Sequence, residues 1–321
     1  MKRRFSVTAM AVLILLSLPL SGQAAEFLIP VGRIIGLHLN DNTVIIAAYD
    51  DSLGANARDA GLRIGDQILS VNGSPVCHAQ EVPRLLAQGS GPVEITVRRS
   101  GKLHTLEITP TQTPEGCKLG LYLRQGIAGI GTVTWYDPAT GNFGALGHGV
   151  STPKGTLLEL SSGEAYEARV QSVIRGKCGE PGQLRGDTDQ QQIGQILRNT
   201  PQGVFGKAII GWYGQPMPVA AFEDVRTGPA VIRSTVSGNS VREYSVEIIR
   251  IYPMEREDNR NFLLRITDPE LLNTTGGIVQ GMSGSPIIQD GKLVGAVTHV
   301  LVNDPTRGYG IFIENMLDAA G

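Results

Sequence analysis

A serine between glycines is the feature of the sequence with the clearest chemistry. It lies in the segment Gly281-Met282-Ser283-Gly284-Ser285-Pro286. A serine hydroxyl becomes a useful nucleophile when a base removes its proton and backbone amides stabilise the charge that develops on the attacked carbonyl. The two glycines allow the backbone to bend so that the amides of Gly281 and Ser283 can face one pocket. We predict that Ser283 is the nucleophile and that Gly281 and Ser283 form the oxyanion hole, with Ser285 as the alternative nucleophile.

Two of the five histidines are candidates for the base that this serine needs. His148 ends a glycine-rich corner, Gly144 to His148, well upstream of the serine, whereas His299 lies shortly after it. The order histidine before serine is that of the chymotrypsin triad, which favours His148. His299 remains as an alternative base or a residue that lines the substrate cleft. The other three histidines are most simply surface or turn residues: His38, His78 and His104.

A triad also needs a carboxylate that orients the imidazole and stabilises its charged form. The Gly-x-Ser-Gly-x-Pro string resembles the nucleophile loop of chymotrypsin-like serine proteases, in which the acid comes much earlier in the chain, at the seam between two barrels. On spacing alone Asp224 suits that layout, whereas Asp268 lies only 15 residues before Ser283. The residue types leave both carboxylates open.

A closer resemblance covers residues 128–317. It is carried by the following strings: Gly144-Ala145-Leu146-Gly147-His148, Ile266-Thr267-Asp268, Thr275 through Gln289, and Gly295 to Val300 with Val302 to Gly310. Together they resemble the stage IV sporulation protein B family of serine peptidases, peptidase family S55. The resemblance implies a triad of His148, Asp268 and Ser283.

The resemblance also implies a biological setting. Members of this family are exported from the forespore into the intermembrane space. There they cleave a membrane-bound regulator of an intramembrane protease, which triggers processing of a late sigma factor. They also cleave themselves near the N-terminus, for which residues 26–30 are the candidate zone in this chain. The implied partners are therefore this regulator and the protein itself.

The residues before the peptidase region indicate a peptide-binding module. The string from Gly65 to Gly73, Gly-Asp-Gln-Ile-Leu-Ser-Val-Asn-Gly, reads as a turn, a short strand and a hairpin turn. It resembles a PDZ domain over residues 28–110. PDZ domains add an extended peptide to a sheet edge and capture its terminal carboxylate. We expect Ile35-Gly36-Leu37 to be the carboxylate loop, or else an ordinary strand entrance.

The composition predicts the elements that must position these residues. Forty-one glycines and 18 prolines in 321 residues favour short strands joined by tight turns. We therefore expect a mainly β protein, with a PDZ domain at 28–110 followed by a chymotrypsin-like double β-barrel protease domain at 116–321. One exception is the stretch 190–199, where Ile193, Ile196 and Leu197 predict a short helix.

Charge, the N-terminus and the cysteines limit the remaining possibilities. A net charge of −2 offers no broad positive field for nucleic acid. Basic residues and an apolar run predict a signal peptide or membrane anchor over 1–25. The three cysteines (Cys77, Cys117, Cys178) have no metal-ligand spacing, so we expect neither metal nor cofactor. Two alternatives stay open: an inactive PDZ scaffold with a protease fold, and a general envelope quality-control serine protease.

Overall fold

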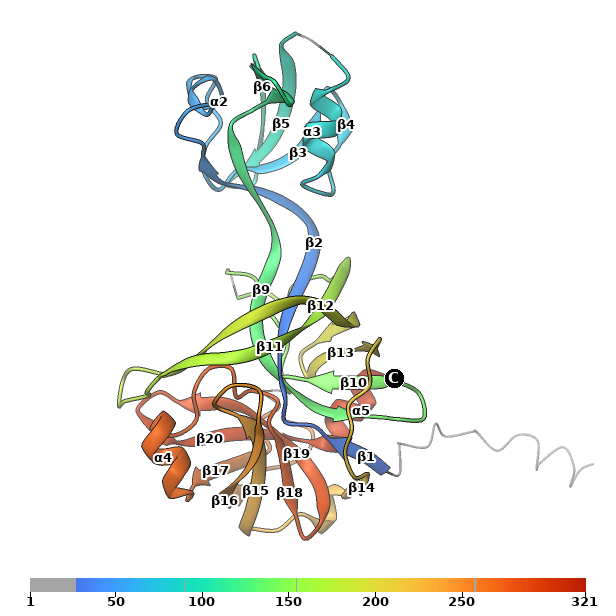
Figure 1. Ribbon diagram of the computed structural model, residues 1–321, viewed down its shortest axis with the longest axis vertical. Coiled ribbons are helices and arrows are strands. Elements are labelled where there is room, and N and C mark those ends of the chain that lie inside the picture. Colours follow the sequence, from blue (N-terminus) through green and yellow to red (C-terminus); the bar gives the residue numbers. More distant parts are fainter. Residues whose placement is uncertain (1–26, 90, 154, 257) are drawn as a thin grey trace, which may run out of the picture.

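A computed structural model describes residues 27–89, 91–153, 155–256 and 258–321. Two β-barrels lie side by side at one end of the molecule, and a smaller module stands away from them on two long strands (Figure 1). The predicted signal peptide or anchor at 1–25 lies outside these residues. Within them, no helix is both long and apolar enough to cross a membrane. The mainly β fold predicted from the sequence is confirmed.

The first barrel closes through six antiparallel strands. Around the ring they are β2 (Ile34–Tyr49), β9 (Leu121–Tyr136), β10 (Asn142–Ala145), β13 (Gly203–Ala208), β12 (Gln183–Thr200) and β11 (Ser162–Ile174), which returns to β2. Alternate apolar side chains of these strands fill the interior, as the two-residue period of a strand requires. Ile35, Val133 and Phe143 are fully buried there.

The second barrel is built from one continuous stretch of chain. Its strands in ring order are β15 (Gly228–Thr235), β16 (Val241–Ile251), β17 (Phe262–Ile266), β20 (Asp304–Phe312), β19 (Lys292–Leu301) and β18 (Pro286–Gln289). Phe262 and Phe312 pack edge to face in its core, with ring centroids 4.6 Å apart. The helix α4 (Pro269–Thr275) precedes the serine segment, and α5 (Ile313–Ala320) ends the chain.

Short elements complete the two barrels. The strand β1 (Phe27–Pro30) pairs with β9 and with β14 (Met217–Pro218). The single turn of 3-10 helix η1 (Phe222–Asp224) leads into β15. Because Leu28 is fully buried among residues of β9, β19 and α5, β1 is part of the protease fold.

The smaller module has its own apolar core. It uses the far halves of β2 and β9 together with α2 (Ala55–Asp59), β3 (Gln67–Val71), β4 (Ser74–Pro75), α3 (Glu81–Leu86), β5 (Val93–Arg99), β6 (Lys102–Ile108), β7 (Thr111–Thr113) and β8 (Gly116–Lys118). The predicted Gly-Asp turn is fixed by an ion pair, since buried Asp66 receives two hydrogen bonds from Arg99.

The order of the two domains differs from the sequence-based prediction. Residues 34–39 pair with residues 127–132 inside the first barrel, and the same two strands pair again, from Val44 to Tyr49, inside the PDZ module. The module is therefore inserted into the first barrel, and the boundary predicted at residue 28 is wrong. A sequence pattern shows that a segment forms a strand but not which distant strand it joins, so this arrangement was not visible from the sequence.

The predicted helix at 190–199 is also wrong. These residues belong to β12, and its register shifts between Ile196 and Arg198. A β-bulge of this kind restarts the two-residue alternation. It therefore places the apolar residues at intervals that imitate a helix.

Candidate active site

The histidine predicted as the base is positioned by a tight reversal at the end of β10. Leu146 has φ +70° and Gly147 has φ +68°, a left-handed conformation that is unusual for leucine. It is held by the buried Leu146 side chain and by a hydrogen bond from the Leu146 amide to the Thr132 carbonyl of β9 (3.1 Å). A strained backbone conformation persists only where the surrounding contacts hold it in place. The reversal at Leu146 and Gly147 directs His148 out of the first barrel and toward the second.

The serine segment forms a second tight turn, between α4 and β18. Gly281 has φ +100° and Gly284 has φ +95°. A Cβ on Gly284 would lie 2.0 Å from the Thr132 carbonyl oxygen and 2.5 Å from the Leu146 nitrogen. Glycine is therefore required there for two reasons, the backbone conformation and the close approach of the first barrel.

Strand β9 fixes the direction of the peptide groups in this turn. The Thr132 hydroxyl donates to the Gly281 carbonyl (2.8 Å), the Thr132 amide donates to the Ser283 carbonyl (3.0 Å), and the Thr134 hydroxyl donates to the Gly284 carbonyl (2.8 Å). With these carbonyls held, the amides of Gly281 and Ser283 donate to no group in the described part of the chain. Two free amides on one turn have the character of an oxyanion hole.

Ser283 and His148 line the same cavity between the barrels. Its volume is about 310 Å³, and its remaining wall is largely apolar, with Leu37, Ile127 and Ile130 among its residues. The Ser283 hydroxyl donates to the Thr298 carbonyl (2.6 Å) and, within the described residues, makes no hydrogen bond to His148. A rotation of the Ser283 side chain is needed before the imidazole can accept its proton.

The electrostatics of His148 suit a base. Burial lowers its pKa, because an apolar surrounding disfavours the imidazolium, while a hydrogen bond to the Gly149 carbonyl opposes that effect. The Nδ1 atom lies 3.0 Å from this carbonyl oxygen. A proton on Nδ1 makes that bond and leaves the lone pair on Nε2. The imidazole is therefore neutral near pH 7, with its basic nitrogen free.

The second candidate histidine lies against the first. The rings of His148 and His299 have centroids 5.0 Å apart and are tilted by 38°. Burial, and then the neighbouring His148, lower the pKa of His299 to about 4. Its Nδ1 is buried and has no hydrogen-bond partner among the described residues. The structure thus brings both candidates together, with His299 as the weaker base.

The alternative nucleophile is not accessible. Ser285 is fully buried, and its hydroxyl donates to the Ser234 hydroxyl of β15 (3.0 Å). It therefore holds the serine turn to the second barrel.

The carboxylate predicted for the triad is elsewhere. Asp268 is the N-cap of α4, where its side chain accepts hydrogen bonds from the amides of Leu271 (2.9 Å) and Ser245 (3.4 Å). Leu263 and His299 both pair with Tyr309, so Leu263 marks the level of His299 in the sheet. Asp268 comes five residues after Leu263. At about 3.3 Å per residue, Asp268 therefore lies roughly 16 Å along the chain from the level of His299.

Neither predicted carboxylate contacts an imidazole. Asp224, the alternative acid, forms an ion pair with Lys292 (2.8 Å). In the described chain, no carboxylate is hydrogen-bonded to His148 or His299, so the structure does not bring Asp268 into a triad. A capping aspartate before Pro269 is a signal that the sequence carried, and it should have indicated a structural role.

The carboxylate loop predicted for the PDZ module is wrong as well. Ile35, Gly36 and Leu37 lie inside β2, paired with β9 on one edge and with β11 on the other. Their backbone groups are used in the barrel ladder, and Leu37 instead lines the cavity that contains Ser283.

The structure indicates another loop for this role. A mainly apolar groove of about 440 Å³ runs between α3 and the start of β9, and Gly120, with φ +64°, forms the turn at one end of it. The amides of Leu119 and Gly120 have no acceptor in the part of the chain described here. Free amides at such a turn are the arrangement by which PDZ domains hold a terminal carboxylate. The Leu119-Gly120-Leu121 string was the available signal.

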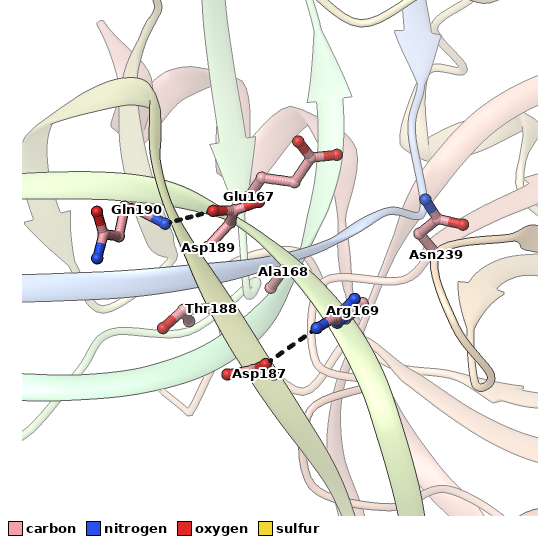
Figure 2. Close-up of a pocket in the computed structure, with 8 residues that line it drawn as sticks. All are labelled: Glu167, Ala168, Arg169, Asp187, Thr188, Asp189, Gln190 and Asn239. Carbon is pink, nitrogen blue, oxygen red and sulfur yellow. Dashed lines mark hydrogen bonds and ion pairs between the residues drawn. The ribbon is translucent and has the colours of Figure 1, made fainter.

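A separate polar cavity lies away from this chemistry. It has a volume of about 470 Å³ and is lined by β11, β12 and Asn239 of the loop before β16 (Figure 2). Three of its charged side chains form ion pairs, since Arg169 contacts Asp187 (3.3 Å) and Glu167 contacts Arg33 (2.7 Å). Throughout the described residues, no three His, Cys, Asp or Glu side chains are grouped for a metal ion, and all three cysteines are free thiols.

Comparisons with curated proteins give partial matches. The chain is 34% identical over 147 residues to a putative zinc metalloprotease of Agrobacterium fabrum, covering 44% of this chain and 35% of that protein. It is 24% identical over 180 residues to a probable periplasmic DegP-like serine endoprotease of Marinomonas sp., covering 52% of this chain and 34% of that protein. The chain spans about a third of the length of these relatives.

Two solved protease structures share a partial likeness with this chain. The active form of the Rv3671c protease from M. tuberculosis has 15% identity and a TM-score of 0.39, with 61% of this chain and 75% of that chain covered. The HtrA-type protease AlgW with a decapeptide has 13% identity and a TM-score of 0.37, with 65% and 57% covered.

The family comparisons cover most of the chain. Residues 47–99 match the PDZ domain, within the inserted module. Residues 115–317, more than half of the chain, match the SpoIVB peptidase family S55, and they span the serine turn, both candidate histidines and most of the two barrels. The chain therefore belongs to the SpoIVB peptidase S55 family of serine peptidases and carries a PDZ domain.

Proposed function

We propose that the protein is a serine endopeptidase in which Ser283 is the nucleophile and His148 the general base. One observation carries the proposal: both side chains line one cavity, beside a turn whose Gly281 and Ser283 amides are free to donate. A nucleophile, a neutral base and an oxyanion hole are the parts that acyl transfer needs.

The reaction follows from this placement. Nε2 of His148 takes the hydroxyl proton as the Ser283 oxygen bonds to the scissile carbonyl carbon, and the resulting oxyanion accepts hydrogen bonds from the two amides. The C–N bond then breaks, and the imidazolium gives its proton to the leaving amine. A water molecule, deprotonated by the same nitrogen, attacks the acyl carbon. The ester bond breaks, and the proton returns to Ser283.

The orienting role that a carboxylate plays in other triads falls here to the Gly149 carbonyl. It accepts a hydrogen bond at Nδ1 of His148 and so fixes the ring orientation and the tautomer. A neutral carbonyl stabilises the imidazolium less than a carboxylate does. We expect a slower enzyme than one with a complete triad.

The PDZ groove supplies the second half of the proposed function. Unpaired amides at Leu119 and Gly120 and the apolar wall formed with Val82 and Leu86 fit the C-terminus of a peptide with an apolar last residue. Peptide termini are therefore the partners that we assign to this domain.

Membership of the S55 family and the basic, apolar N-terminal segment support a role in sporulation signalling. In this role the enzyme is exported from the forespore into the intermembrane space, anchored or released at its N-terminus. Its substrate is a membrane-bound regulator of an intramembrane protease, and this cleavage triggers late sigma-factor processing. Self-cleavage belongs N-terminal to Phe27, because Leu28 and Ile29 are buried in β1 and cannot enter an active site without unfolding that strand.

Labelling with a fluorophosphonate probe tests the chemistry. We expect the probe to label the parent protein and not Ser283→Ala, because it reacts only with an activated serine. The matched control is Ser285→Ala, which keeps the reactive hydroxyl and should retain labelling. Equal labelling of the parent and Ser283→Ala would assign the nucleophile to another residue.

Two observations favour a second candidate, a peptide-binding scaffold without hydrolytic activity. The Ser283 hydroxyl donates to the Thr298 carbonyl, and no carboxylate supports His148 in the described chain. A parent protein that neither labels nor cleaves casein, but binds peptides through the PDZ groove, would establish this alternative.

A further inference from the structure

Among the described residues, one edge of strand β9 pairs with no other strand over most of its length. On its other edge it pairs with β2 from Leu121 to Thr132, with an interruption at Gly126. Its remaining partners, β1 and β10, begin only at Val133. The free edge therefore runs from the PDZ groove to the serine turn along a single strand (Figure 1).

The hydrogen-bonding direction of the PDZ half can be read from one bond. The Asp50 amide donates to the Gly120 carbonyl (2.8 Å), so Gly120 faces β2. Because successive residues of a strand direct their N–H and C=O groups to opposite edges, those of Leu121 and Leu123 face the groove. The wall opposite this edge is α3 rather than a strand.

The barrel half can be read in the same way. The Val133 amide donates to the Arg33 carbonyl, whereas the Thr132 amide donates to the Ser283 carbonyl on the other side. The same alternation directs the N–H and C=O groups of Ala128 and Ile130 toward the free edge, where they meet no backbone partner in the described chain. Ala128 is exposed, and Ile130 lines the cavity of Ser283.

Gly126 joins the two halves. Before Gly126 the odd-numbered residues direct their N–H and C=O groups to the free edge, and after it the even-numbered residues do so. The left-handed φ of Gly126, +69°, allows this change. A Cβ at this position would lie 2.1 Å from the Leu39 carbonyl oxygen. The residue therefore bends β9 while the free edge stays continuous.

We propose that one extended polypeptide substrate adds to this edge, with its C-terminus in the PDZ groove and its scissile bond at Ser283. The proposal rests on the function proposed above and assigns the geometry of the substrate. Unpaired edge groups recruit extended chains, because each residue added satisfies backbone donors and acceptors that otherwise face water.

The direction of the substrate follows from the position of the carboxylate loop. A C-terminus held at Leu119 and Gly120 makes the bound chain antiparallel to β9, so its upstream residues reach Ala128 and Ile130. Nine residues separate Leu121 from Ile130, which at about 3.3 Å per residue is roughly 30 Å. The enzyme should therefore cut about ten residues before a free C-terminus. The apolar cavity lies on the PDZ side of Ser283 and would receive side chains just after the cut.

Peptides of varied length test this proposal with the full, unmodified protein. An unstructured peptide with leucine-valine pairs repeated every four residues and a C-terminal valine offers many equivalent bonds. Its C-terminus is prepared as a free acid, as an amide, or as a free acid extended by five residues, of which four are glycine and serine and the last is again valine. Mass spectrometry locates the cuts. We expect cuts clustered about ten residues from the free acid, a shift by about five residues toward the C-terminus in the extended peptide, and a roughly tenfold or greater loss of kcat/KM with the amide.

The other outcomes separate the two proposals. Cuts that depend on Ser283 but stay at the same bonds in the acid and the extended peptide, with equal rates for the amide, would overturn the spanning substrate alone. Fluorophosphonate labelling with no cut in any peptide would also overturn it while leaving Ser283 reactive. Loss of both labelling and cleavage would overturn the peptidase assignment as well.

An enzyme variant gives an independent measurement. Ala128→Pro removes one N–H on the free edge and none from the ladder with β2, and proline is tolerated at such exposed edge positions. Ala128→Val keeps the N–H and is the matched control. We expect the proline variant to lose at least fivefold in kcat/KM on the free acid relative to the valine variant. Equal activity of the two variants on the free acid would contradict edge addition.

Discussion

The two barrels differ in how they are assembled, although each has six strands. The second barrel is formed by consecutive strands from β15 to β20, whereas the first joins β2 to β9 across an inserted module of about eighty residues. Each barrel contributes one reactive group, Ser283 from the second and His148 from the first. The nucleophile is therefore positioned by a local turn, and the base by contacts between distant parts of the chain.

Because Ser283 and His148 come from different barrels, their relative position depends on the contacts that β9 makes with both. Its residues Thr132 and Thr134 hold the serine turn, and Thr132 also accepts the hydrogen bond from Leu146 that directs His148. A single strand of the first barrel thus aligns both halves of the site. The following predictions test whether this alignment, rather than a carboxylate, sustains the chemistry.

Removal of the base gives the largest expected effect. His148→Ala should lower kcat by about 10⁴-fold or more, as loss of a triad base does in characterised enzymes. His299→Gln should lower it by no more than about tenfold, because its low pKa makes His299 the weaker base. Steady-state kinetics on a casein-derived peptide provide the measurement. A larger effect at His299 would exchange the two roles.

The contact between the barrels comes next. Gly284→Ala places a methyl group 2.0 Å from the Thr132 carbonyl oxygen and forces a left-handed alanine. We expect about 2 to 5 kcal/mol of lost stability and at least tenfold lower activity. Gly291→Ala is the matched control, because Gly291 has a similar backbone conformation but a Cβ built on it meets no atom of the described residues within 4 Å, apart from its chain neighbours. This control substitution should lower the free energy of unfolding by about 1 to 2 kcal/mol. Equal losses in chemical denaturation would show that the barrels are not held at this point.

Acid sensitivity should follow the two imidazoles. Burial lowers the pKa of both, to about 4 for His299, so the unfolded chain binds more protons once the pH falls below about 6.5. Their contribution to stability is present above that pH and is lost progressively down to about pH 4. Urea denaturation between pH 4 and 7 should show this loss, and His299→Gln should reduce it. An unchanged pH dependence in that variant would assign the sensitivity to other groups.

The smallest effect is expected at the predicted acid. Asp268→Asn keeps an N-cap side chain of equal quality, so both stability and kcat should change little, by less than about threefold in rate. If this aspartate instead oriented His148 in the working enzyme, the same change would lower kcat by about 10⁴-fold. Asp224→Asn, which removes only an exposed ion pair with Lys292, is the reference.

The part of the site that could be predicted from the sequence is the part that is local. Gly281 and Gly284 have the positive φ that their positions in the serine string indicated, and the Gly65 to Gly73 string lies in the PDZ module as expected. In both cases the required backbone conformation is specified within ten residues. The fold class followed from the same turn chemistry.

What could not be predicted depends on strand partners. Ile35-Gly36-Leu37 and Leu119-Gly120-Leu121 have nearly the same residue pattern, but the first is paired on both edges and the second borders a groove. Only the pairing of the first string with β9 and β11 distinguishes the two. These partners lie about a hundred residues away in the sequence, so the residues of the string itself do not reveal the pairing. Asp268 is a different case, because the family resemblance implies a triad role, whereas the Asp268-Pro269 pair carries the N-cap signal that matches its place at the start of α4.

The insertion between paired neighbours has a consequence for the host fold. Leu39 and Ile127 are opposite each other where the chain leaves the first barrel and returns, so the two ends of the module are about 5 Å apart. From the viewpoint of the barrel, the whole module is one long hairpin loop, and the entropy of closing a loop grows only slowly with its length. The peptide-binding module can therefore be exchanged, enlarged or replaced by a short turn with little penalty to the catalytic scaffold.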